Sequence, residues 1–145
     1  MPEKETLERA EQDKREGKSP STQAGEFVRE GIDHIREGKH GAASAKQAIA
    51  IGLSKARRAG VDLAPPKKGR VSEKTRKSAE RDSSRGRSRK KKAVSVSRSR
   101  SSEAALKREP RSAASHKALS RQARSAARTR KKAGTKTAQS RRKAA

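Results

Sequence analysis

The chain has 145 residues, enough for one ordinary domain, and a formal net charge of +25. Leu, Ile, Val and Phe together number only 15, and so few large apolar residues at so high a charge predict extensive disorder. The absence of cysteine excludes disulfides and thiolate metal sites and fits an intracellular protein. No signal-like apolar run or stretch of about 20 apolar residues occurs, so we expect a soluble, cytoplasmic protein with no membrane partner.

The charge is distributed unevenly between two parts of the chain. Residues 1–66, the head, hold 12 basic and 11 acidic side chains, whereas residues 67–145, the tail, hold 29 basic and 5 acidic ones. A near-neutral head joined to a strongly basic tail indicates a polyanionic partner, above all nucleic acid.

In chain order, residues 2–16 are predicted to form a charged helix. Pro2 suits a first helical position, and Glu5 with Arg9 is a favourable i,i+4 pair. Leu7 and Ala10 are its only apolar residues. Because two such residues cannot make a buried stripe, we expect a solvated, fraying helix that ends at Gly17.

Two further helices are predicted over residues 23–37 and 45–59, joined by a short turn that favours an antiparallel hairpin. Ser44 and Gln47 form a capping box, and Gly60 suits a Schellman ending. At about 100° per residue, each helix has one apolar arc, and the two arcs are offset by 21 residues: Ala24, Phe27, Val28, Gly31, Ile32 and Ile35 in the first, and Ala45, Ala48, Ile49, Gly52, Leu53 and Ala56 in the second. Glu26, Arg29, Glu30 and Asp33 fall outside the first arc.

The glycines at the middle of both arcs, Gly31 and Gly52, lead to the hypothesis that the two backbones approach closely there. The alternative is that both are tolerated defects in weak helices.

Phe27, the only aromatic residue, is predicted to be the core plug. Ala64-Pro65-Pro66 stops any helix, so we place the boundary with the tail at residue 66.

The predicted fold is all-α: a charged N-terminal helix (1–18), a short antiparallel helical hairpin (19–66) and a long intrinsically disordered basic tail (67–145). Alanine-rich residues 103–133 are expected to become helical only when their charges are neutralised. A hairpin this small is marginal alone, so a homo-oligomer or a protein partner is expected to support it.

The tail is predicted to bind nucleic acid through phosphates, since each contact releases condensed counterions but reads no base sequence. Double-stranded DNA is the first choice, and RNA stays open because arginine can stack on bases although Trp and Tyr are absent. The candidate contacts are Lys67, Lys68, Arg70, Arg85, Arg87, Arg89, Lys90, Lys91, Lys92, Arg98, Arg100, Arg121, Arg124, Arg128, Arg130, Lys131, Lys132, Arg141, Arg142 and Lys143.

Catalytic and metal-binding patterns are sparse. His34 and His40 flank the hairpin turn, a poor arrangement for a metal site, and solvent exposure explains them better. The sequence has no phosphate-cradling loop, dinucleotide fingerprint or nucleophile elbow. We therefore expect no enzyme activity, no cofactor and no metal.

The segments IREGKHG at residues 35–41 and KQAIAIGLSKARR at residues 46–58 resemble a small bacterial and phage domain of unknown function, marked by a Glu-Gly-Lys turn and a KQAIAIAL-Ser-x-Ala-Arg helix. Some relatives are labelled plasmid stabilisation or DNA-binding proteins, and this chain has Gly52 where many of them have alanine. The tail is similar to the Lys/Arg/Ala-rich tails of histone-like proteins. These resemblances imply a bacterial source.

The leading hypothesis is a nucleoid-associated, histone-like protein that binds DNA without sequence specificity. The alternative is an adaptor whose hairpin binds a protein partner while the tail tethers it to RNA or another polyanion.

Overall fold

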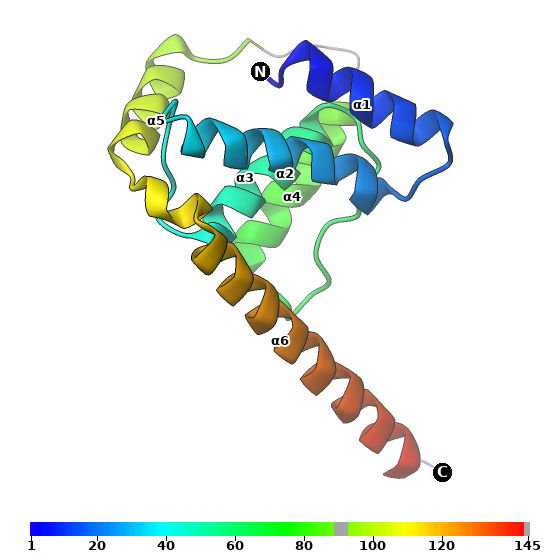
Figure 1. Ribbon diagram of the computed structural model, residues 1–145. Helices are drawn as coiled ribbons and strands as arrows, with labels where there is room; N and C mark the ends of the chain where they lie inside the picture. Colours follow the sequence, from blue (N-terminus) through cyan, green and yellow to red (C-terminus); the bar gives the residue numbers. More distant parts are fainter. Residues whose placement is uncertain (89–92, 144–145) are drawn as a thin grey trace.

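The computed structural model describes residues 1–88 and 93–143 and is all-helical there (Figure 1). Six α-helices and one short 3-10 helix follow one another in this described part: α1 (Lys4–Arg15), α2 (Pro20–Arg36), α3 (Ala45–Arg58), α4 (Glu73–Arg87), α5 (Val96–Arg108), η1 (Arg111–Ala114) and α6 (His116–Lys143). Its nearest approach to a strand is an isolated bridge between Lys68 and Val71. The all-α prediction is confirmed, whereas the predicted division into three units stays a prediction.

The ends of α3 follow the predicted capping chemistry. The Ser44 hydroxyl accepts a hydrogen bond from the Gln47 amide at 3.1 Å, and the Gln47 side chain accepts one from the Ala43 amide, one residue earlier than a capping box requires. Gly60 has φ +97°, and the amide of Val61 reaches the carbonyl of Ala56 at 3.1 Å. The Schellman ending is therefore confirmed.

Helices α2 and α3 form the predicted hairpin, and its buried residues gather in two small clusters. One, at the turn, contains Ile35, Ala42, Ala48, Ala113 and Ala114; the other contains Ala10, Ala24, Phe27 and Ala56. Phe27 is 1% exposed, so its predicted role as core plug is confirmed. Both clusters draw residues from outside the hairpin, which shows how so small a pair of helices is supported.

The glycine hypothesis is right for one helix only. A Cβ placed on Gly52 would lie 2.6 Å from the Cα of Val28, so α3 lies directly against the backbone of α2. A Cβ on Gly31 would meet nothing within 4 Å, although Gly31 is buried. The two glycines therefore do not face each other, because the close approach is offset by three residues along α2.

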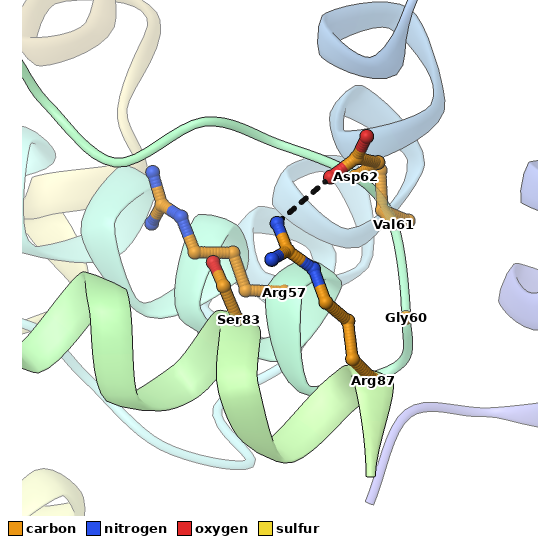
Figure 2. Close-up of a pocket in the computed structure, with 6 residues that line it drawn as sticks. All are labelled: Arg57, Gly60, Val61, Asp62, Ser83 and Arg87. Atoms are coloured by element: carbon orange, nitrogen blue, oxygen red, sulfur yellow. Dashed lines mark hydrogen bonds and ion pairs between the residues drawn. The ribbon is translucent and has the colours of Figure 1, made fainter.

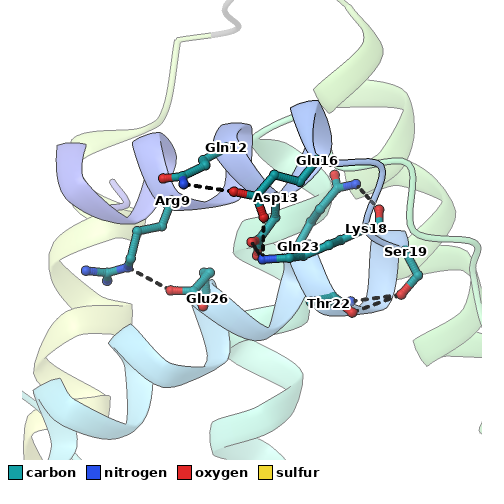
Figure 3. A network of polar contacts seen from close by, with 9 residues as sticks. All are labelled: Arg9, Gln12, Asp13, Glu16, Lys18, Ser19, Thr22, Gln23 and Glu26. Carbon is teal, nitrogen blue, oxygen red and sulfur yellow. Dashed lines mark hydrogen bonds and ion pairs between the residues drawn. The ribbon is translucent and has the colours of Figure 1, made fainter.

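The prediction that the first helix is solvated is wrong. Thr6, Ala10 and Asp13 of α1 are buried, and Arg9 donates to the carboxylate of Glu26 on α2 at 2.7 Å (Figure 3). Lys18, in the turn between the two helices, donates to Asp13 of α1, also at 2.7 Å. Small and polar side chains bonded across the two helices thus replace the apolar stripe that the sequence lacks.

Glu30, which falls outside the predicted apolar arc of α2, is 4% exposed and joins three segments. Its carboxylate accepts hydrogen bonds from Lys55 of α3 and from the amide of Glu3, both at 3.0 Å. Burial alone would raise the pKa of Glu30, but these bonds and one from Thr6 outweigh it and lower that pKa. A buried carboxylate therefore fixes α1 and α3 to α2.

The prediction of a long disordered tail is also wrong for the residues that the structure describes. Ser72 caps α4 by accepting from Thr75, and Arg76 pairs with both Glu73 and Glu80 along the helix. Ala79 and Ser83 are buried, and a Cβ on Gly86 would lie 1.9 Å from the carbonyl oxygen of Arg57. Small residues allow α4 to pack closely on α3, so a core of large apolar residues is not needed.

Residues 106–114, here called the strap, hold the base of α6 to the hairpin turn. The amides of Gly41 and Ala42 donate to the carbonyls of Leu106 and Pro110 at 2.8 and 3.2 Å. Arg36 donates to the carbonyl of Ala114 at 3.1 Å. From this anchored base, α6 extends away from the rest of the molecule (Figure 1).

Candidate nucleic-acid interface

Helix α6 carries the largest uncompensated charge in the described part of the chain. Of its 28 residues, 11 are Lys or Arg and none is Asp or Glu. At 1.5 Å per residue the helix is about 42 Å long. Among its described side chains, residues 116–136, every lysine and arginine is exposed and none makes an ion pair. This arrangement leaves the cations available to an external polyanion.

The head, by contrast, neutralises much of its own charge. Arg9, Lys18, Lys39 and Lys55 all pair with carboxylates of the head. The pKa of Lys39 is raised, first by its hydrogen bond to Glu37 and also by its bond to Glu3. These cations serve internal contacts, which concentrates the available positive charge on the second half of the chain.

The structure places the predicted contacts in four groups. Lys67, Lys68 and Arg70 lie in the loop before α4; Arg85 and Arg87 lie on α4; Arg98 and Arg100 lie on α5; and Arg121, Arg124, Arg128, Arg130, Lys131 and Lys132 lie on α6, all of them exposed. Arg141, Arg142 and Lys143 belong to the last turns of α6, where side chains are not described, and Arg89, Lys90, Lys91 and Lys92 lie outside the described residues.

Sequence reasoning missed two exposed cations of α6, Lys117 and Lys136. Each lies four residues from the nearest other lysine or arginine, so no local concentration of charge marks it. The absence of any acidic residue after Glu109 is a signal that would have included both, because it marks the whole helix and not its clusters.

A cavity of about 390 Å³ lies between the end of α3 and α4 and is lined by Arg57, Gly60, Val61, Asp62, Ser83 and Arg87 (Figure 2). Arg57 is 7% exposed and donates to the carbonyls of Leu63 and Ala64, both at 3.3 Å. Burial lowers the pKa of its guanidinium, and the charge of Asp82 opposes this. Arg57 therefore holds the chain after α3 and is not presented to solvent.

The second arginine of this cavity, Arg87, is a predicted contact. It donates to Asp62 at 3.1 Å, and the two side chains are 71% and 82% exposed. An ion pair this exposed contributes little to stability, so Asp62 holds the Arg87 side chain only weakly. Ser83, also on the wall, has a buried hydroxyl without a hydrogen-bond partner.

The histidines of the turn are arranged differently from the prediction of solvent exposure. The side chain of His34 is only 14% exposed, and its Nε2 lies 2.9 Å from a carboxylate oxygen of Glu3. This contact, together with Lys39, lowers the pKa of Glu3. In the part of the chain that the structure describes, His, Asp and Glu side chains nowhere gather in threes as a metal site would require.

None of the helices in the described ranges is long and apolar enough to span a membrane.

Comparison with known proteins gives one similarity. A family of unknown function (DUF6496) matches residues 14–68, which include the whole α2–α3 hairpin and less than half of the chain. The match fits the predicted resemblance to a small domain of unknown function, while the Glu-Gly-Lys motif and the labels of the relatives stay predictions. No curated protein and no solved structure matches the chain.

Proposed function

We propose that this protein binds double-stranded DNA without sequence specificity, as a nucleoid-associated protein, and that α6 is its main contact element. One observation carries the proposal: α6 is a 28-residue helix with 11 cations and no acid, whose described cations make no ion pair. Six to ten phosphate contacts lower affinity by about 10³–10⁵ between 50 and 200 mM salt, so binding should be strong and salt-dependent.

Two features support DNA over the alternative of an adaptor tethered to RNA. Phe27, the only aromatic residue, is 1% exposed, so the chain offers no aromatic platform on which unpaired bases could stack. The apolar clusters of the hairpin are covered by α1 and by η1, so an adaptor would need a largely polar surface of the head. This arrangement favours a function in which the head holds α6 in position and α6 contacts the DNA.

Gel-shift titration of the full chain tests the proposal. Duplexes of two unrelated sequences, a structured RNA and heparin are compared at 50–300 mM salt. We expect equal affinities for the two duplexes and a plot of log K against log salt with a slope of about −5 or steeper. A slope near zero, or a strong preference for the RNA at every salt concentration, contradicts the proposal.

A further inference from the structure

The exposed cations and the partly buried residues of α6 lie on two different faces of the helix. On a wheel of about 100° per residue, six exposed cations fall within an arc of about 100°. We call them the cation row: Lys117, Arg121, Arg124, Arg128, Lys131 and Lys132. The partly buried residues of the same helix, Ala118, Leu119, Gln122, Ala126 and Ala133, occupy another arc of similar width, nearly opposite.

The anchoring of the helix decides which face meets solvent. The base of α6 contacts η1 and α3, and Ala118 and Leu119 in its first turn are partly covered there. Because the cation row begins on the other side of that turn, at Lys117, it points away from the head. The 3-10 helix η1, which ends two residues before α6 begins, is itself held in place, because Arg36 donates to the carbonyl of Ala114 and Ala114 is fully buried.

The dimensions of the row fit the phosphates of a duplex. Apart from the adjacent Lys131 and Lys132, successive members are three or four residues apart, which places them about 4.5–6 Å apart along the axis and makes the row about 22 Å long. Over that length of its axis a duplex carries about 13 phosphate charges, six or seven on each strand. The row is therefore long enough to contact several phosphates of one strand.

The same one-sidedness argues against a helix seated deep in the major groove. Such a helix is flanked by both phosphate strands while its inner face reads base edges, so it needs cations on both flanks. Among residues 116–136 of α6, the charged side chains outside the row are Arg130, opposite the row, and Lys136, at the edge of the partly buried arc. The remaining side chains opposite the row are small or uncharged: Leu119, Gln122, Ala123 and Ala126.

We infer that α6 lies along one phosphate ridge of duplex DNA with the cation row against it, and that cations elsewhere in the tail contribute little. This inference rests on the proposed function. It adds a defined surface and an orientation to a binding mode that otherwise depends only on the total charge.

The test compares two triple variants of the full chain that lose the same charge through the same substitution. The row variant carries Arg121→Gln, Arg124→Gln and Arg128→Gln. The matched control removes three cations outside the row, in Arg98→Gln, Arg100→Gln and Arg130→Gln. All six side chains are exposed and make no ion pair, so both variants should keep the circular dichroism and melting temperature of the parent.

With about 0.9 lost per phosphate contact, the slope of log K against log salt should fall by about 2.7 in the row variant and by less than 1 in the control. Equal falls in the two variants overturn the inference and leave the proposed function standing. If the parent shows no salt-dependent binding to duplex DNA, both are overturned. If the row variant loses affinity for structured RNA but not for the duplex, the assignment to duplex DNA is overturned.

Discussion

Replacing each mid-face glycine by alanine gives a sharp test of the packing between α2 and α3. A Cβ on Gly52 would lie 2.6 Å from the Cα and 2.9 Å from the amide nitrogen of Val28. Carbon atoms pack best at about 3.5–4.0 Å, so the helices must separate by roughly 1 Å. Backbone atoms cannot rotate out of the way as a flexible side chain can, and the whole interface has to move.

Overpacking costs about 1–3 kcal/mol. A clash with backbone atoms belongs in the upper part of that range, about 2–3 kcal/mol, and the better helix propensity of alanine returns about 1 kcal/mol. We expect Gly52→Ala to lower the free energy of unfolding by about 1–2 kcal/mol, which lowers the melting temperature by about 3–7 °C in a chain of this size. For Gly31, where a Cβ meets nothing within 4 Å, only the propensity gain applies. Gly31→Ala should raise stability by about 0.5–1 kcal/mol.

Urea and thermal unfolding of the full-length variants, followed by circular dichroism at 222 nm, measures both changes. The two substitutions are chemically identical and both sites are buried, so each serves as the control for the other. The reasoning is refuted if Gly52→Ala is as stable as the parent, or if the two variants lose stability equally.

Two further predictions concern the contacts that hold α1 and the strap to the hairpin. Glu30→Gln should destabilise the protein by about 1–3 kcal/mol at pH 7, because it weakens the buried bond to Lys55. The pKa of Glu30 is lowered by folding, so its contribution is present above the unfolded value of about 4.3 and is lost as the pH falls through the folded value. The gap between parent and variant in urea unfolding should therefore close toward pH 3; a gap that stays constant from pH 7 to pH 3 contradicts this account. Gly41→Ala would place a Cβ 1.9 Å from the carbonyl oxygen of Glu109, displace the strap and speed hydrogen exchange at the Ala42 amide, which donates to Pro110. Gly25→Ala, where a Cβ meets nothing, is the control, and equal exchange in both variants would show that the strap is not closely packed.

The hairpin could be predicted because its signals are local. Ser44 starts α3 and Gly60 ends it through bonds within a few residues, and the 3.6-residue period identifies the buried arc in advance. The arc was nevertheless incomplete, since Glu30 is buried as well. Its burial depends on Lys55 and on the amide of Glu3, partners 25 and 27 residues away, and no local pattern identifies them.

The tail was predicted to be disordered because it contains few large apolar residues, and the number of such residues is a measure of how large a core can be. This fold needs few of them, because its buried contacts are made mostly by small residues. Ala79, Ala113 and Ala114 are buried, and the close contacts form at Gly41 and Gly86. Alanine and glycine contribute almost nothing to a hydropathy-based prediction of a core. They permit close backbone contacts, but only when a complementary surface is present.

For the candidate nucleic-acid interface, too, some properties follow from the sequence and others only from the tertiary structure. The sequence by itself determined the sign and amount of charge, its concentration after residue 66 and the lack of acidic residues in α6, because these are properties of composition. The spacing of the cations puts them on one side only when residues 116–143 are helical, whereas the sequence predicted a disordered tail. Only the tertiary structure decided that this side faces away from the head. The strap fixes the base of α6 against the hairpin turn through Arg36, Gly41 and Ala42, and these long-range backbone contacts set the direction in which the charge is presented.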